Sequence, residues 1–150
     1  SRRPNSASIG TRAYQMALYV VFESNLQMLA DNPTLYNMYP DCRDYIASCP
    51  VNWDETRVLA AEFGEYTIVA RRSGNKWYIG GITNETARDI DVKLDFLAEG
   101  LSYNATSFTD GINSSVQAMD YRKESTRLSR NSTIRIHMVR NGGYAAVLEP

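Results

Sequence analysis

The stretch of sequence that decides the fold reads YTIVARRSGNKWYIGGI and runs from Tyr66 to Ile82. Its two ends, 66–70 and 76–82, are apolar and rich in β-branched and aromatic residues, which favour β-strands. The residues Ser73-Gly74-Asn75 between them form a tight-turn signal. The stretch therefore predicts an antiparallel hairpin. Within its second strand, Trp77 and Tyr78 should point to opposite faces of the sheet.

Further strands are predicted downstream of this hairpin. Residues 89–94 alternate strictly, so Ile90, Val92 and Leu94 should share one face. Other short apolar segments, each bounded by turn residues, are 58–59, 101–108, 134–139 and 144–148. Short strands separated by turn signals at such regular intervals are typical of an antiparallel sandwich. The polar residues 113–132 fit a long loop that includes one strand at most.

The segment before residue 50 has a helical pattern instead. Thr11 can cap a helix over 12–23, in which nearly every residue from Ala13 to Phe22 is apolar. A surface helix would show one apolar stripe and one polar face. We therefore expect this helix to be covered on two sides.

Two shorter helices are predicted after it. Ser24 and Gln27 form a capping box for the first. Pro40 opens the second, whose apolar face includes Cys42, Tyr45, Ile46 and Cys49, and Pro50 ends it. The two cysteines lie two helical turns apart, too far for a disulfide, so we interpret them as buried thiols.

The fold predicted is mainly β: an antiparallel β-sandwich at residues 51–150, preceded by a short helical segment at residues 1–50. A chain of 150 residues is too short for a complete β/α barrel. The net charge of -1 gives no basic field for nucleic acid. No apolar run is long enough for a membrane span. One histidine and two cysteines predict no metal site built by this chain.

The sequence resembles a known family. Residues 10–24 and 26–31 resemble the last helical part of the catalytic barrel in glycoside hydrolase family 97. Residues 53–59 (WDETRVL) resemble the passage into that family's C-terminal β-domain. The match continues in order through 64–66, 68–72, 77–81, 83–84 and 142–143. The helical segment thus resembles the end of a β/α barrel.

The resemblance implies a parent enzyme from bacteria that hydrolyses α-linked glucosides or galactosides. Family members have an N-terminal β-sandwich, a central barrel and a C-terminal β-sandwich, and they hold calcium near the substrate. The catalytic residues and calcium ligands would precede residue 1, so none is assigned here. The implied partners are the rest of the barrel, the N-terminal β-domain and an oligosaccharide, in the periplasm or cell envelope.

The sequence departs from the family at three positions. Tyr14 stands where His is expected, Asn25 where Pro is usual, and Glu85 where Trp is usual. The first departure leaves open whether that helix position has a polar role. The third removes an aromatic side chain that could pack or stack at a loop tip.

Trp53 and Trp77 are the aromatic candidates for stacking on sugar, although packing is the alternative for both. The adjacent Asp54 and Glu55 invite a glycosidase interpretation. Neighbouring strand residues point to opposite faces, so the two carboxylates cannot face one substrate, and pairing with Arg57 is expected instead. His137 is expected to be a solvated strand residue.

Two hypotheses follow. In the first, the chain is a non-catalytic sandwich that supports a barrel. In the second, it is an autonomous carbohydrate-binding module. The opening residues, Ser1 to Ser6, have no apolar region of a signal peptide, so an interior or C-terminal piece of a longer protein is expected. For this chain alone, the apolar helix predicts self-association through residues 12–30, or docking on the sandwich.

Overall fold

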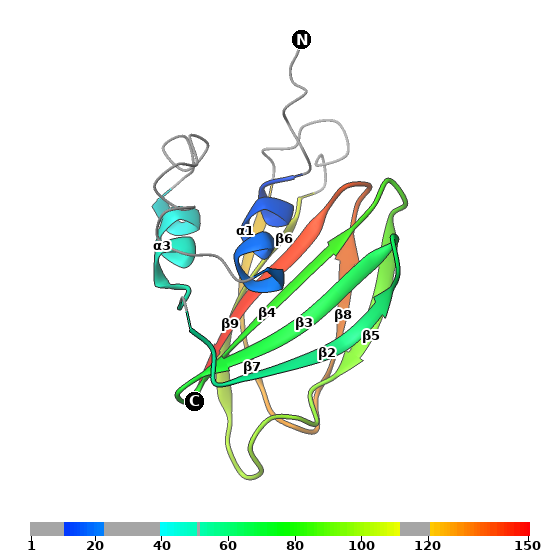
Figure 1. The fold of residues 1–150 in the computed structure, drawn as a ribbon. Coiled ribbons are helices and arrows are strands. Elements are labelled where there is room, and N and C mark those ends of the chain that lie inside the picture. The colour runs from blue at the N-terminus through cyan, green and yellow to red at the C-terminus, as the bar shows by residue number, and fades with distance from the viewer. Residues whose placement is uncertain (1–10, 23–39, 51, 112–120) are drawn as a thin grey trace.

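The computed structural model of the chain describes residues 11–22, 40–50, 52–111 and 121–150 (Figure 1). Two helices come first, α1 (Arg12–Val21) and α3 (Pro40–Ser48). Eight strands follow in the described ranges: β2 (Glu55–Glu62), β3 (Tyr66–Ser73), β4 (Lys76–Thr83), β5 (Arg88–Lys93), β6 (Tyr103–Asp110), β7 (Tyr121–Leu128), β8 (Thr133–Met138) and β9 (Gly143–Glu149). The mainly β fold predicted from the sequence is confirmed.

The strands form two antiparallel sheets. The larger has the order β2-β3-β4-β9-β6-β7, and the smaller contains β5 and β8. The hairpin that decides the fold is β3–β4, in which Arg72 pairs with Trp77 and Tyr66 with Thr83. Its turn contains Gly74 at φ 63, a left-handed conformation that glycine adopts without strain. The polar residues 113–132, for which the sequence predicts a long loop with one strand at most, contain the strand β7.

A core of apolar side chains lies between the two sheets. Ile90, Val92 and Leu94 share this core, as their alternation predicts. The six-stranded sheet supplies its other half, including Ile68, Ile79 and Leu148. A β-bulge in β2, between Val58 and Ala60, breaks the alternation there and lets both Leu59 and Ala60 face inward.

A second core lies on the opposite face of the six-stranded sheet, where α1 and α3 cover it. Met16, Val20 and Ile46 from the helices pack there against Val69, Tyr78 and other sheet residues. The molecule therefore has three layers, namely helices, a large sheet and a small sheet (Figure 1). Of the two outcomes foreseen for the apolar helix, docking on the sandwich is the one that the structure shows.

The helix predictions agree with these elements where they are described. Thr11 is the N-cap of α1, and its side chain accepts a hydrogen bond from the backbone N–H of Tyr14. The helix α3 begins at Pro40, as predicted. The predicted capping box at Ser24 and the side chain of Cys42 lie outside the described residues. Within the described part, neither helix is both long and apolar enough to cross a membrane.

Candidate functional site at the junction of helix and sandwich

The helix α1 lies directly on the backbone of the two central strands β4 and β9. A Cβ atom added to Gly80 of β4 would lie 2.7 Å from Cβ of Val20 and 2.9 Å from the carbonyl oxygen of Ala17. One added to Gly143 of β9 would lie 2.5 Å from Cα of Tyr14. All three distances are too short for real atoms. The two glycines therefore create the seat on which the helix rests.

The start of α1 is tied to the sandwich by the buried carboxylate of Asp110, at the end of β6. The Thr11 hydroxyl donates to Oδ1 of Asp110 at 2.6 Å. The backbone N–H groups of Val139 and Gly143 donate to Oδ2 at 2.8 and 3.3 Å. A negative charge at this position also complements the positive end of the helix dipole. One side chain thus joins α1, β6 and the β8–β9 turn.

The β8–β9 turn completes this tie through its backbone. Asn141 adopts φ 52, which asparagine tolerates better than most residues. Its carbonyl oxygen accepts from the N–H of Thr11 at 3.1 Å, and its own N–H donates to Asn84 at 2.7 Å. A Cβ atom on Gly142 would lie 2.1 Å from Oδ2 of Asp110. The turn therefore requires glycine at position 142.

Asp110 should make stability depend on pH. Burial raises the pKa of its carboxyl above the usual value, although the hydrogen bonds from Thr11, Val139 and Gly143 act in the opposite direction. The native state therefore binds more protons than the unfolded state between the two pKa values. In that window, the contribution of Asp110 to the free energy of unfolding falls as the pH rises.

We therefore expect wild-type protein to gain stability relative to Asp110→Asn as the pH is lowered from neutral to about 4, near the unfolded pKa. Urea unfolding of both proteins across this range measures the difference. Asp95→Asn, at an exposed loop position, controls for the change in net charge. A difference that stays constant with pH would contradict this assignment.

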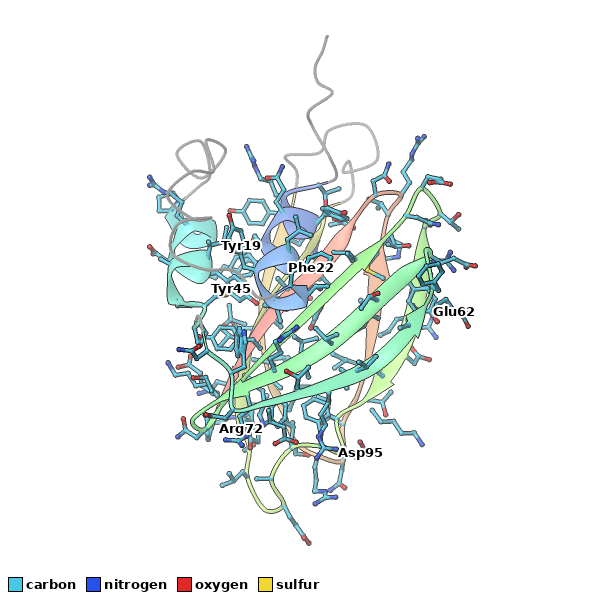
Figure 2. The ribbon with its side chains drawn as sticks, viewed as in Figure 1. Tyr19, Phe22, Tyr45, Glu62, Arg72 and Asp95 are labelled. Atoms are coloured by element: carbon cyan, nitrogen blue, oxygen red, sulfur yellow. The ribbon has the colours of Figure 1, made fainter. Side chains whose placement is uncertain are left out.

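The helix α3 is fixed to the same face of the sheet by two tyrosines. The Tyr45 hydroxyl donates to the carbonyl oxygen of Ala146 at 3.1 Å, and the Tyr78 hydroxyl donates to that of Ser48, also at 3.1 Å. Burial raises the pKa of Tyr45 well above its usual value, so the hydroxyl stays protonated and remains a donor. Figure 2 shows Tyr19 and Tyr45 between the two helices.

Cys49, just after α3, is a half-buried free thiol. Burial raises its pKa to about 12. A thiol with such a pKa is hardly ionised at neutral pH, so it is a poor nucleophile and metal ligand. This environment fits the packing role predicted from the sequence.

The last turn of α1 is held by Arg71 of β3. Its Nη2 donates to the carbonyl oxygen of Val21 at 3.0 Å, and its Nη1 donates to the Thr56 hydroxyl at 3.3 Å. A cation at the C-terminal end of a helix satisfies free carbonyls and complements the helix dipole. Arg71 therefore has a structural partner at this end of the junction.

The two tryptophans that are candidates for sugar binding differ in how far their side chains are buried. Trp77 is only 4% exposed and lies in the core between the sheets. It packs edge-on against Phe96, with 4.7 Å between the two ring centroids. Trp53 is half-buried on the side of the large sheet that the helices cover. It packs edge-on against Tyr78, with 5.3 Å between the two ring centroids. Trp77 and Tyr78 do point to opposite faces, as predicted, and both are buried. Sugar binding by either tryptophan stays a prediction.

The buried nitrogen Nε1 of Trp53 has no hydrogen-bond partner, and neither has Nε of Arg71. Among the described residues, these two are the buried side-chain nitrogens left without a partner. Trp53 packs against the core on the helix side of the sheet, and Arg71 contacts the end of α1. This end of the junction is thus less completely satisfied than the end at Asp110.

The adjacent carboxylates Asp54 and Glu55 are engaged in structural contacts. Glu55 accepts from Nε of Arg57 at 2.7 Å, as predicted, and from Nε of Arg72 at 3.3 Å. These hydrogen bonds lower the pKa of Glu55, with that from Arg57 the larger cause. Asp54 accepts from the N–H of Gly74 at 2.7 Å and so braces the β3–β4 turn.

The outer face of the small sheet carries a ladder of charged side chains. Nδ1 of His137 lies 2.6 Å from Oδ1 of Asp89, and Nε of Arg135 donates to Asp91 at 3.0 Å. His137 is exposed, as predicted. Within the ranges that the structure describes, no three His, Cys, Asp or Glu side chains are grouped so that they could hold a metal ion.

Sequence reasoning missed the residues that matter most at the junction. Gly80 was predicted only as part of a strand, and neither Gly143 nor Asp110 was assigned a structural role. A glycine inside a strand is itself a sign that another backbone approaches closely. That signal was present in the sequence, but the partner of the close approach was not.

One face of α1 remains partly open. Tyr14 and Leu18 are half-buried, and Phe22, just after the helix, is 56% exposed. The three lie four residues apart, so they follow one stripe along the helix surface (Figure 2 labels Phe22). The sequence predicts cover on two sides of α1, and the sandwich provides one of them.

Comparison with known proteins identifies the family. The family described as "Glycosyl-hydrolase 97 C-terminal, oligomerisation" matches residues 52–149. The chain is 46% identical over 138 residues to a retaining alpha-galactosidase of Bacteroides thetaiotaomicron, covering 92% of the chain and 21% of that protein. It is 34% identical over 146 residues to a protein of Streptomyces bingchenggensis named probable retaining alpha-galactosidase, covering 97% of the chain and 21% of the relative.

Solved structures show the same relationship. A glycoside hydrolase family 97 enzyme from Pseudoalteromonas sp. strain K8, in complex with panose, superposes with a TM-score of 0.80 at 28% identity. The match covers 95% of this chain and 23% of that enzyme. The chain thus spans about a fifth of the length of its curated relatives. It belongs to glycoside hydrolase family 97 and corresponds to the C-terminal part of such an enzyme.

Proposed function

We propose that this chain is a non-catalytic β-sandwich that closes and supports the catalytic barrel of a family 97 α-glycosidase. The observation that carries the proposal is the seating of α1 on the glycines of β4 and β9, with Asp110 fixing the helix start. By family resemblance, α1 is the end of the barrel. The sandwich would therefore hold the barrel wall from outside.

The open stripe of α1 supports this role. Tyr14 and Leu18 are only half-buried and Phe22 is 56% exposed, and an apolar side chain gains roughly 1.5–3 kcal/mol when it is fully buried. In the parent enzyme, preceding barrel elements would cover this stripe. The half-buried α1 would then have the cover on two sides that its sequence predicts.

The parent is proposed to be a retaining α-galactosidase. Two curated relatives, at 46% and 34% identity, bear that name. The panose complex at 28% identity is the reason that α-glucosides stay in the assay. The oligosaccharide would bind to the part of the barrel that precedes this chain. By family resemblance, calcium near the substrate would be bound by residues that precede this chain. By family resemblance, the parent is placed in the periplasm or cell envelope.

The 150-residue chain should not hydrolyse nitrophenyl α-galactoside or nitrophenyl α-glucoside. The full-length parent, expressed alongside, is the positive control and should be active on at least one of them. Circular dichroism of the short chain checks that it is folded. Turnover by the short chain, retained after purification to homogeneity, would show that it contains catalytic groups.

Isothermal titration of the same chain with melibiose, maltose and starch separates the supporting role from an autonomous carbohydrate-binding module. We expect no heat of binding, because Trp77 is buried and Trp53 is packed against Tyr78. Millimolar or tighter binding would favour the module.

We propose oligomerisation as a second function of the sandwich. The printed description of the matching family includes oligomerisation, and the match spans every described strand. In this role, the sandwich would bring two copies of the parent together on a side away from α1.

A further inference from the structure

The two edges of the six-stranded sheet are protected to different degrees. The strand β7 at one edge has four charged residues, Arg122, Lys123, Glu124 and Arg127. Such charges discourage pairing with another chain. The strand β2 at the other edge has an uncharged centre, from Val58 to Ala61. The β2 edge is therefore the better candidate for a contact surface.

Exposed apolar side chains gather at this same edge. Among the described residues, four large hydrophobic side chains are exposed, and two of them belong to β2 and the turn after it: Val58 at 65% and Phe63 at 105%. A fully exposed phenylalanine makes no apolar contact within its own chain. Phe63 is thus available to pack against another molecule.

A groove opens beside the first half of β2, between that strand and β5. Its volume is about 450 Å³. Its lining combines apolar and charged side chains: Val58, Leu59, Val92 and Phe96 with Arg57, Asp91, Lys93 and Asp95. Figure 2 shows Glu62 and Asp95 apart from one another on this side of the molecule, so the exposed turn and the groove occupy different ends of it.

These features are self-complementary. If two copies place their β2 strands antiparallel about a two-fold axis, with residue 62 opposite residue 57, then Ala61 lies opposite Val58. Each Glu62 then faces Arg57 of the other copy, whose Nε also donates to Glu55 of its own chain. Each Phe63 reaches the level of the other copy's groove. A two-fold contact uses the same patch twice, so one strand supplies both the projecting side chain and the receiving groove.

We propose that the β2 edge is the surface through which two copies of this chain associate, with Phe63 of each copy entering the groove of the other. The inference rests on the proposed oligomerisation and names its surface. The bulge between Val58 and Ala60 would lie near the two-fold axis and interrupt a regular ladder there. Side-chain packing and the two Arg57–Glu62 pairs would therefore hold the contact, more than backbone hydrogen bonds.

Sedimentation velocity of the 150-residue chain over a range of concentrations tests the proposal. Wild-type protein should be a dimer. Phe63→Asp should raise the dissociation constant by about tenfold or more, because the carboxylate cannot replace the apolar contacts of the ring and loses water when it is buried. Phe63 is fully exposed, so this variant should keep its fold, and circular dichroism checks that it does.

A charge exchange provides the sharper readout. Arg57→Glu alone and Glu62→Arg alone should each weaken the dimer, because like charges then face each other across the axis. The double variant, Arg57→Glu with Glu62→Arg, should recover dimerisation, since it restores opposite charges. Leu101→Asp, at an exposed apolar position outside β2, is the matched control and should leave the dimer intact.

The possible results distinguish failure of the proposed β2 contact from failure of the proposed oligomerisation. A monomeric wild-type chain would overturn both the surface and the proposed oligomerisation. A dimer unaffected by Phe63→Asp and by the charge changes would overturn the surface and leave oligomerisation standing. Dissociation by Phe22→Asp, with no effect of Phe63→Asp, would assign the contact to residues 12–30 instead.

Discussion

Replacing Gly143 with alanine should lower the free energy of unfolding by about 2–3 kcal/mol and loosen α1 from the sheet. The added Cβ would lie 2.5 Å from Cα and 2.7 Å from N of Tyr14, and 2.9 Å from the carbonyl oxygen of Gly81. All three are backbone atoms, so no rotamer change can remove the clash. Urea unfolding followed by circular dichroism and tryptophan fluorescence measures the loss.

Gly81→Ala is the matched control for that substitution. It lies in the neighbouring strand β4, but its Cβ would face the other side of the sheet and meet Cγ1 of Ile68 at 3.1 Å. A side-chain atom can shift by a few tenths of an ångström, so a smaller loss is expected. Equal losses for the two variants would show that the close approach of α1 is not what Gly143 provides.

Trp77→Ala should be the most destabilising single change in the sandwich, by about 3–5 kcal/mol. The indole is 4% exposed and contacts Phe96, so its removal leaves a cavity between the sheets. Trp53→Ala should cost less, because Trp53 is only half-buried. Chemical denaturation of both variants provides the comparison, and Trp77→Phe should recover part of the loss.

The same variants bear on sugar binding. If Trp77→Ala kept its stability but abolished a heat of binding to oligosaccharide, the indole would be a ligand contact. A large loss of stability with no effect on titration would assign it to the core.

The strands could be predicted because an alternation of apolar and polar residues indicates a strand with one buried face. Ile90, Val92 and Leu94 show this most simply, since polar residues separate them and all three reach the core between the sheets. The β-bulge in β2 was not predictable in this way. It turns two consecutive residues, Leu59 and Ala60, toward the core, whereas regular alternation would place neighbouring residues on opposite faces.

The helix–sandwich junction was less accessible to sequence reasoning, because its contacts join residues far apart in the chain. Thr11 and Asp110 are 99 positions apart, yet their side chains share a hydrogen bond. Tyr45 and Ala146 are 101 positions apart. The cap at Thr11 could be predicted from local pattern, whereas its second partner could not. The resemblance to family 97 supplied the correct family but no account of these contacts.

The packing of α1 on the glycines of β4 and β9 has a consequence for protein engineering. A sandwich grafted onto a foreign barrel by a cut at residue 51 would leave its helix behind, and Val69, Tyr78, Phe108 and Ala145 would then meet water. A graft cut just before Thr11 would transfer α1 together with the glycines on which it packs, Gly80 and Gly143, and the carboxylate of Asp110 that binds its start. The transplantable unit is therefore larger than the β-sandwich itself.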